Sequence, residues 1–157
     1  ADLPQDSPLA LYGLGPAWLY AAVARHIAPQ DFYQFDARRG WVKPPLFTPA
    51  KPGRSNIAMT ATETAEFIYL KFDLLADYLE YAPAIPLSLP PPPSGKGLIL
   101  SGKLPNWFYT GLTLFYQRTA WAAIYYPYSN EGIVVSVNDA GGGFRVGQTI
   151  GLERMAI

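Results

Sequence analysis

The chain of 157 residues contains no cysteine and a single histidine, His26. The absence of cysteine excludes a disulfide-stabilised scaffold, a cysteine-ligated zinc site and a thiol nucleophile. One histidine also excludes a histidine-rich metal centre built by one chain. Any serine nucleophile that needs an imidazole base depends on His26.

The chain also has little charge, and its 12 Lys+Arg balance its 12 Asp+Glu. Binding of long nucleic acid without sequence preference needs a strongly basic face, so this class of function is not expected. A small anionic ligand is compatible with a neutral chain, because a few donors in one pocket are enough to bind it.

Long hydrophobic runs are absent too, because no apolar stretch reaches the roughly 18 residues of a membrane-spanning helix. Residues 1–4 have neither the basic nor the apolar region of a signal peptide. We therefore expect a cytoplasmic protein without a membrane partner. The apolar share of 50% excludes a disordered chain.

An internal repeat is present at an offset of 89 residues, where residues 11–20 align with residues 100–109. The two segments share Leu, Gly, Pro, Trp and Tyr at five of ten aligned positions. Each copy predicts a strand, a glycine-containing turn, a buried helix and two further strands. The repeat therefore predicts an α+β fold with two β-α-β-β units in tandem, packed as a pseudo-symmetric pair.

The second copy gives the clearer elements. We expect a helix over residues 106–116 with Pro105 in its first turn, and a short helix over residues 74–80. Runs rich in β-forming residues predict strands over residues 66–72, 98–100, 120–126, 132–137 and 144–150.

A proline-rich passage over residues 44–53 predicts a boundary between two units. Residues 1–50 form an N-terminal half unit, and residues 51–157 form a C-terminal unit. About 50 residues cannot bury an adequate core alone. We therefore expect the N-terminal part to pack against the C-terminal part or against another chain.

The C-terminal unit resembles the small CRISPR-associated ring nucleases that are found beside type III CRISPR systems. The resemblance covers residues 64–151, and the N-terminal copy covers residues 9–43. It rests on an ordered series of short motifs, in residues 99–107, 121–127, 132–135 and 145–148. The resemblance implies ferredoxin-like units and a cytosolic homo-oligomer.

The resemblance also implies a ligand and an activity. The ligand is cyclic tetra-adenylate, the second messenger of type III CRISPR defence, and the activity is a metal-dependent phosphodiesterase in which manganese is favoured. Members of the family also bind RNA ends. None of these properties follows from composition or spacing.

The chain departs from the family pattern in the C-terminal unit. Tyr126 stands where the family has a catalytic aspartate, Tyr128 stands where it has an arginine, and the family's histidines are missing from residues 116–119 and 135–138. The N-terminal copy keeps an Asp-x-Arg-x-Gly pattern from Asp36 to Gly40. The resemblance therefore directs any surviving chemistry to the N-terminal copy.

Two glycine-proline corners, residues 13–16 (the first corner) and residues 102–105 (the second corner), are candidate ligand-binding sites. Each corner leads from a strand into a helix, where free N–H groups and the positive end of the helix dipole suit a phosphate. The alternative is that the glycines only permit a tight turn. The candidate residues are Gly13, Gly15, Gly102, Lys103 and Asn106.

The segment around Asp36 supplies candidate catalytic residues. Asp36 can hold a divalent metal such as Mn²⁺, His26 can ligate the metal or move a proton, and Arg38 and Arg39 can clamp a phosphate. One carboxylate and one histidine are too few for a tight metal site, so neighbouring chains would complete it. The alternatives are an aspartate that caps its own loop, an exposed histidine and two solvated arginines.

The aromatic residues of the second copy have two interpretations as well. Tyr125, Tyr126 and Tyr128 can stack on adenine, or they belong to the core or to a subunit interface.

Two classes of function are therefore compatible with the sequence. The first is a protein that binds cyclic oligoadenylate and either cleaves it or serves as an inactive sensor. The second is a structural subunit that binds a protein partner through the repeated unit.

Overall fold

The computed structural model describes residues 2–51, 57–73, 87–91, 95–138 and 142–152. Their elements follow in the order β1 (Leu9–Leu11), α1 (Ala17–Ile27), β2 (Phe32–Asp36), β3 (Gly40–Val42), β4 (Phe47–Pro49), β5 (Ala58–Glu63), β6 (Phe67–Asp73), β7 (Leu87–Leu89), β8 (Gly97–Gly102), α2 (Asn106–Phe115), β9 (Trp121–Tyr126), β10 (Glu131–Val137) and β11 (Thr149–Gly151).

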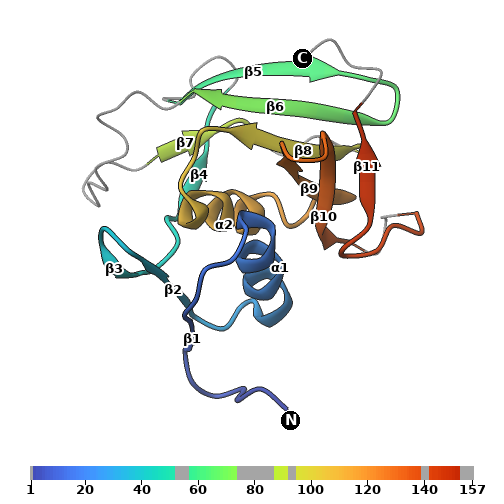
Figure 1. Cartoon of the computed structure of the whole chain (residues 1–157). Coiled ribbons are helices and arrows are strands. Elements are labelled where there is room, and N and C mark those ends of the chain that lie inside the picture. The colour runs from blue at the N-terminus through green and yellow to red at the C-terminus, as the bar shows by residue number, and fades with distance from the viewer. Residues whose placement is uncertain (1, 52–56, 74–86, 92–94, 139–141, 153–157) are drawn as a thin grey trace.

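A six-stranded sheet forms the largest layer and has the order β11-β10-β9-β8-β6-β5 (Figure 1). The strands β6, β8 and β9 run parallel, and β5, β10 and β11 pair antiparallel with their neighbours. Side chains alternate along β8, so Leu98 and Leu100 join the core under the helices while Ile99 joins a cluster on the other face. Burial on both faces explains the continuous apolar run in this strand.

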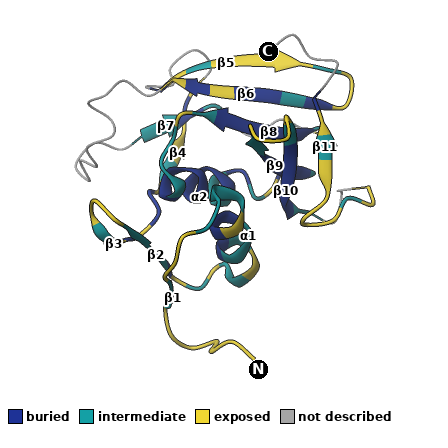
Figure 2. Cartoon of the chain, in the orientation of Figure 1, coloured by how far each residue is buried: buried dark blue, intermediate teal, exposed yellow. Residues whose placement is uncertain are grey.

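Both helices lie on one face of the large sheet, and a three-stranded sheet of order β1-β2-β3 covers their other side (Figure 1). Phe108 and Leu112 of α2 are buried in the main core with Leu100 of β8. Tyr20 and Ala24 of α1 form a smaller core with β1 and β2. Figure 2 shows that burial is concentrated in α2 and in the central strands of the large sheet.

The two repeated segments have the same topology. In residues 9–42 and in residues 97–137, a helix connects two parallel neighbouring strands and a third strand pairs antiparallel with the second. The predicted α+β class is therefore confirmed, and so is the order strand, helix, strand, strand within each of these two segments. A ferredoxin-like arrangement is not established, because β8 and β9 are direct neighbours, whereas a split β-α-β unit has another strand between them.

The structure corrects several predicted elements. Residues 145–148 form a turn, in which Gln148 N–H donates to Arg145 O, and only β11 remains of the strand expected over residues 144–150. Pro105 is the N-cap of α2 and precedes its first turn. The short helix expected over residues 74–80 lies outside the described residues.

Sequence reasoning missed the strands β4, β5 and β7. The proline-rich passage contains β4, which pairs parallel with β7 in a separate two-stranded sheet. Phe47 of β4 packs on α2, with its ring centroid 5.2 Å from that of Phe108. Proline is tolerated at Pro49 because β4 has a neighbour on one side only.

Both corner glycines have positive φ, +144° at Gly13 and +139° at Gly102. A Cβ on Gly13 would meet no atom within 4 Å, whereas one on Gly102 would lie 2.3 Å from the carbonyl oxygen of Phe72 in β6. Both positions therefore require the positive φ that glycine adopts readily. Only at Gly102 would a side chain also collide with a neighbouring strand.

This difference predicts unequal effects of one substitution. Gly13→Ala should lower the free energy of unfolding by about 1–2 kcal/mol through backbone strain. Gly102→Ala should cost roughly 2 kcal/mol more, because the β6–β8 pairing must shift. Urea denaturation of both variants measures this, and equal losses would contradict the close packing at Gly102.

Candidate functional site

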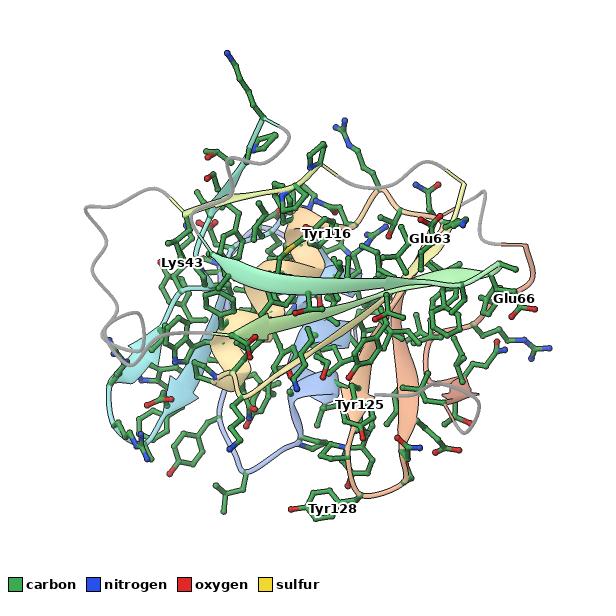
Figure 3. The ribbon with its side chains drawn as sticks, turned by 90° about the horizontal axis from the view of Figure 1, so that it is seen from above. Lys43, Glu63, Glu66, Tyr116, Tyr125 and Tyr128 are labelled. Atoms are coloured by element: carbon green, nitrogen blue, oxygen red, sulfur yellow. The ribbon has the colours of Figure 1, made fainter. Side chains whose placement is uncertain are left out.

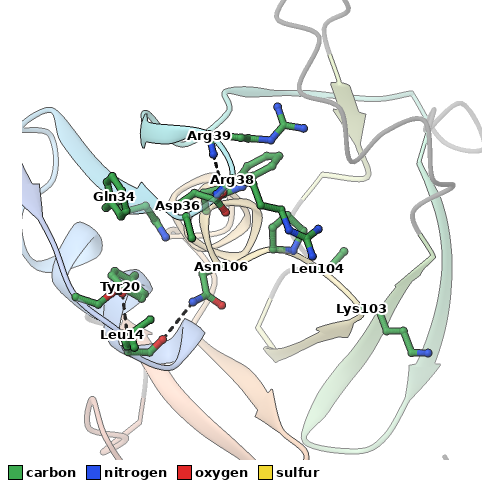
Figure 4. Close-up of a pocket in the computed structure, with 15 residues that line it drawn as sticks. Leu14, Tyr20, Gln34, Asp36, Arg38, Arg39, Lys103, Leu104 and Asn106 are labelled. Atoms are coloured by element: carbon green, nitrogen blue, oxygen red, sulfur yellow. Dashed lines mark hydrogen bonds between the residues drawn. The ribbon is translucent and has the colours of Figure 1, made fainter.

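The main cavity has a volume of about 1020 Å³ and opens where the two corners and the β2–β3 turn meet (Figure 4). The strands β1 and β2 are parallel, so the first corner and the β2–β3 turn follow carboxyl ends of strands at one edge of their sheet. Ligands of α/β sheets bind at such edges. The cavity is lined by Gly13, Leu14, Gly15, Tyr20, Gln34, Phe35, Asp36, Ala37, Arg38, Arg39, Lys103, Leu104, Pro105, Asn106 and Trp107.

A tyrosine hydroxyl fixes each corner. At the first corner Tyr20 Oη donates to Gly13 O and accepts from Gly15 N at 3.1 Å. At the second corner Tyr109 Oη donates to Gly102 O at 2.6 Å. Tyr20 and Tyr109 occupy equivalent positions in the two aligned segments. Each corner therefore combines a glycine with a tyrosine hydroxyl that holds the glycine's carbonyl oxygen.

The two corners also bond to each other. Asn106 Nδ2 at the start of α2 donates to Gly15 O at 3.2 Å, as the dashed line in Figure 4 shows. Asn106 is thus a link between the two halves, and its amide is partly occupied in that role. The bond places the N-termini of α1 and α2 at the same side of the molecule.

Asp36 organises the β2–β3 turn. Its Oδ1 accepts the N–H groups of Arg38 at 2.8 Å and Arg39 at 3.1 Å, and the turn closes at Gly40, where φ is +79°. The pairing of Asp36 with Gly40 leaves residues 37–39 as the hairpin loop, and the positive φ of Gly40 is a conformation that glycine adopts without steric cost. The alternative interpretation of Asp36, a carboxylate that caps its own loop, therefore describes its observed contacts.

A buried hydrogen bond sets the position of this turn relative to the second corner. Gln34 of β2 accepts the hydroxyl of Thr110 in α2 through Oε1 at 2.6 Å, and both residues are fully buried. Arg39 lies over the ring of Trp107 at 5.5 Å from the centroid, a cation–π distance. The β2–β3 turn therefore lies against the second corner.

The cavity favours anions. Arg38, Arg39 and Lys103 carry positive charge in its lining, and Asp36 is the one acidic lining residue. Neither helix has an acidic residue in its first turn or a side-chain cap at its N-terminus. The dipoles of both helices therefore add to the positive potential of the side chains. In Figure 4 Arg38 extends toward Leu104, and Lys103 lies at the opposite end of the view from Tyr20.

Most of the predicted site residues come together in this cavity, but two do not. Gly102 supports the second corner without lining the cavity. His26 is exposed in the last turn of α1, roughly 13 Å along the helix axis from the N-terminus that borders the cavity. The structure therefore does not bring His26 to Asp36.

Within one chain, the lining of the main cavity offers few side-chain ligands for a manganese ion. Asp36 is the one carboxylate in the lining, and its Oδ1 already accepts two backbone N–H groups. No group of three or more His, Cys, Asp or Glu side chains lies together in the described part of the chain. A metal bound at Asp36 would need ligands from another chain.

Sequence reasoning missed the residues that position the site. Gln34 and Thr110 gave no signal, because a buried polar pair between distant segments has no local pattern. Tyr20 and Tyr109 did carry one, since they match in the repeat, but the match alone does not reveal that each hydroxyl bonds a corner carbonyl. The tyrosines at the β9–β10 turn lie outside the lining of the cavity.

A family model described as CRISPR-associated protein (Cas_csx3) matches residues 73–151, which is half of the chain. The match contains the second corner and the whole of β8, α2, β9 and β10. The first corner and the Asp36 turn lie before it. No curated protein sequence matches the chain significantly. Within the described residues, no helix is both long and apolar enough to cross a membrane.

The buried tyrosines predict how stability depends on pH. Burial raises the pKa of the Tyr109 hydroxyl, with a smaller rise from Tyr69, and burial also raises the pKa of Tyr116. A raised pKa in the folded state gives stability that is present below pH ~10, where unfolded tyrosine titrates, and is lost as the pH rises further. Tyr109→Phe should therefore flatten the loss of unfolding free energy above pH ~10.

The same variant should lose about 1 kcal/mol at neutral pH, because the Gly102 carbonyl loses its donor. Urea denaturation at several pH values measures both effects. The matched control at neutral pH is Tyr128→Phe, which changes an exposed ring. A Tyr109→Phe variant with an unaltered slope above pH ~10 would contradict this assignment.

Proposed function

Because the chain belongs to the CRISPR-associated protein family Cas_csx3, we propose that it acts in CRISPR defence by binding a cyclic oligoadenylate messenger, cyclic tetra-adenylate, in the main cavity. The observation that carries this proposal is the meeting of both corners and the β2–β3 turn around one anion-favouring cavity. Its volume of about 1020 Å³ lies at the upper end of the range for small-molecule sites, which suits a large cyclic ligand.

Phosphate groups of the ring would contact the cationic side of the cavity. Arg38 offers a planar guanidinium that can bind phosphate with two parallel hydrogen bonds, and Lys103 offers a compact charge at the second corner. The N-termini of α1 and α2 add backbone donors. A neutral chain thereby binds a polyanion through one local concentration of donors.

The geometry supports binding better than turnover. Ring cleavage needs the 2′-oxygen of a ribose to attack the adjacent phosphorus and to expel the 5′-oxygen, leaving a 2′,3′-cyclic phosphate. A base must take the 2′ proton, and the 5′-oxygen must receive one. Asp36 is the one lining carboxylate and is engaged in its turn, so the chain alone serves as a sensor subunit. A metal-dependent enzyme would require neighbouring chains to complete the site in a homo-oligomer.

Charge removal tests the binding proposal. Arg38→Ala and Lys103→Ala should each weaken binding of cyclic tetra-adenylate by roughly 10- to 100-fold, the value of one charge-assisted hydrogen bond. The matched control is Arg145→Ala, an exposed arginine outside the cavity, which should leave the affinity within about twofold. Isothermal titration calorimetry measures all three variants.

Binding that is absent in the wild-type chain, together with co-purification of a protein partner, would favour the structural subunit instead. If Arg38→Ala and Lys103→Ala both bind cyclic tetra-adenylate as tightly as the wild type, the ligand binds at another site. RNA ends serve as a second ligand in the same titration, because a phosphate cavity open to solvent also admits a linear terminus.

Asp36 separates a sensor from an enzyme. Asp36→Asn keeps an Oδ1 acceptor for the two turn N–H groups and removes the negative charge. We expect this variant to bind the ring at least as tightly as the wild type, and the wild type to leave the ring intact with or without Mn²⁺. Chromatography of the incubated ligand checks this. Cleavage by the wild type that disappears in Asp36→Asn would establish an enzyme that uses Asp36.

A further inference from the structure

Three aromatic side chains lie side by side across the outer face of the three-stranded sheet. Phe35 of β2 and Trp41 of β3 are paired residues, with ring centroids 5.5 Å apart. Tyr12 follows the last residue of β1, and its ring centroid lies 4.9 Å from Phe35 and 6.2 Å from Trp41. We call these three residues the aromatic platform.

The platform faces away from the helices because of strand alternation. Phe32 and Gln34 of β2 are buried toward α1 and α2, so Phe35 points to the opposite face. The exposed fraction is 71% for Tyr12 and 53% for Trp41, which is high for large aromatic side chains. This exposure leaves ring surface available to a ligand.

The platform continues directly into the main cavity. Phe35 itself lines the cavity, Tyr12 precedes the corner residue Gly13, and Trp41 follows the turn that carries Arg38 and Arg39. Aromatic rings beside a group of cations match a nucleotide in both of its parts, because the base offers a π face and the phosphate offers negative charge. A purely apolar partner would not need the adjacent cations.

We propose that the aromatic platform stacks an adenine base of a nucleotide whose phosphate occupies the main cavity, with Trp41 and Tyr12 as the stacking rings. This inference rests on the proposed function and adds the residues that recognise the base. It assigns base recognition to the N-terminal half, in place of the Tyr125, Tyr126 and Tyr128 group suggested by the sequence. Tyr128 provides the comparison, since it is exposed on the β9–β10 turn and lies outside the cavity lining (Figure 3).

Fluorescence titration and calorimetry with three ligands test the platform. The ligands are cyclic tetra-adenylate, adenosine 5′-monophosphate and ribose 5-phosphate, which has the phosphate without the base. Trp41→Ala should weaken both adenine ligands by roughly 5- to 100-fold, the effect of losing one stacked base. Ribose 5-phosphate should bind Trp41→Ala and the wild type equally.

Two further variants keep the test specific. Trp41→Phe retains a stacking ring and should restore the affinity to within about threefold, while it removes the ligand-dependent change in tryptophan emission. Tyr128→Ala is the matched control and should bind all three ligands as the wild type does. Circular dichroism confirms that each variant folds, which is expected because Trp41 is an exposed residue.

The outcomes separate this inference from the proposed function. If Arg38→Ala weakens cyclic tetra-adenylate and Trp41→Ala does not, the function stands and the platform is overturned. If the ring does not bind but adenosine 5′-monophosphate quenches Trp41 and ribose 5-phosphate does not, the platform stands and the ring is the wrong ligand. Equal effects of Trp41→Ala and Tyr128→Ala, a change of oligomeric state in Trp41→Ala, or no binding of any adenine ligand would overturn the platform.

Discussion

The packing of α1 against α2, with both helix N-termini at one side, is the constraint on which the cavity depends. The hydrogen bond from Asn106 to Gly15 O joins the two helix N-termini, and the bond from Thr110 to Gln34 joins α2 to β2. The Gln34–Thr110 bond is buried, so breaking it would leave two polar side chains without any hydrogen-bond partner. This cost favours one position of β2 along α2 over the alternatives. The Asp36 turn follows from that position, because it lies at the end of β2.

The elements of the two aligned segments were predictable because their sequence signals are local. Glycine, proline and tyrosine recur at fixed spacing, and each pair has the same backbone role in the two copies: positive φ at Gly13 and Gly102, and a hydroxyl bond to each corner carbonyl. Strand and helix periodicity also located β8, α2, β9 and β10 within about a residue or two. The tyrosine bonds give a structural reason for the recurrence that does not involve a ligand.

Contacts between distant segments could not be predicted in this way. The parallel pairing of β4 with β7 and of β6 with β8 joins segments whose own sequences carry no register information. His26 illustrates the same limit, since its place near a helix end suggested chemistry, but the length of α1 separates it from the cavity. Asp36 is the last residue of β2, and only the structure shows that its carboxylate accepts two N–H groups of the turn that follows.

The two halves differ in a way that makes them complementary. The first corner has Leu14 where the second has Lys103, and the first turn carries Arg38 and Arg39 where the second carries exposed Tyr128. The fold brings the first turn against the second corner, with Arg39 over Trp107, so the cations of both halves share one cavity. Neither half provides this grouping alone. The helix packing that buries the core therefore also brings the cations of the two segments together in one cavity.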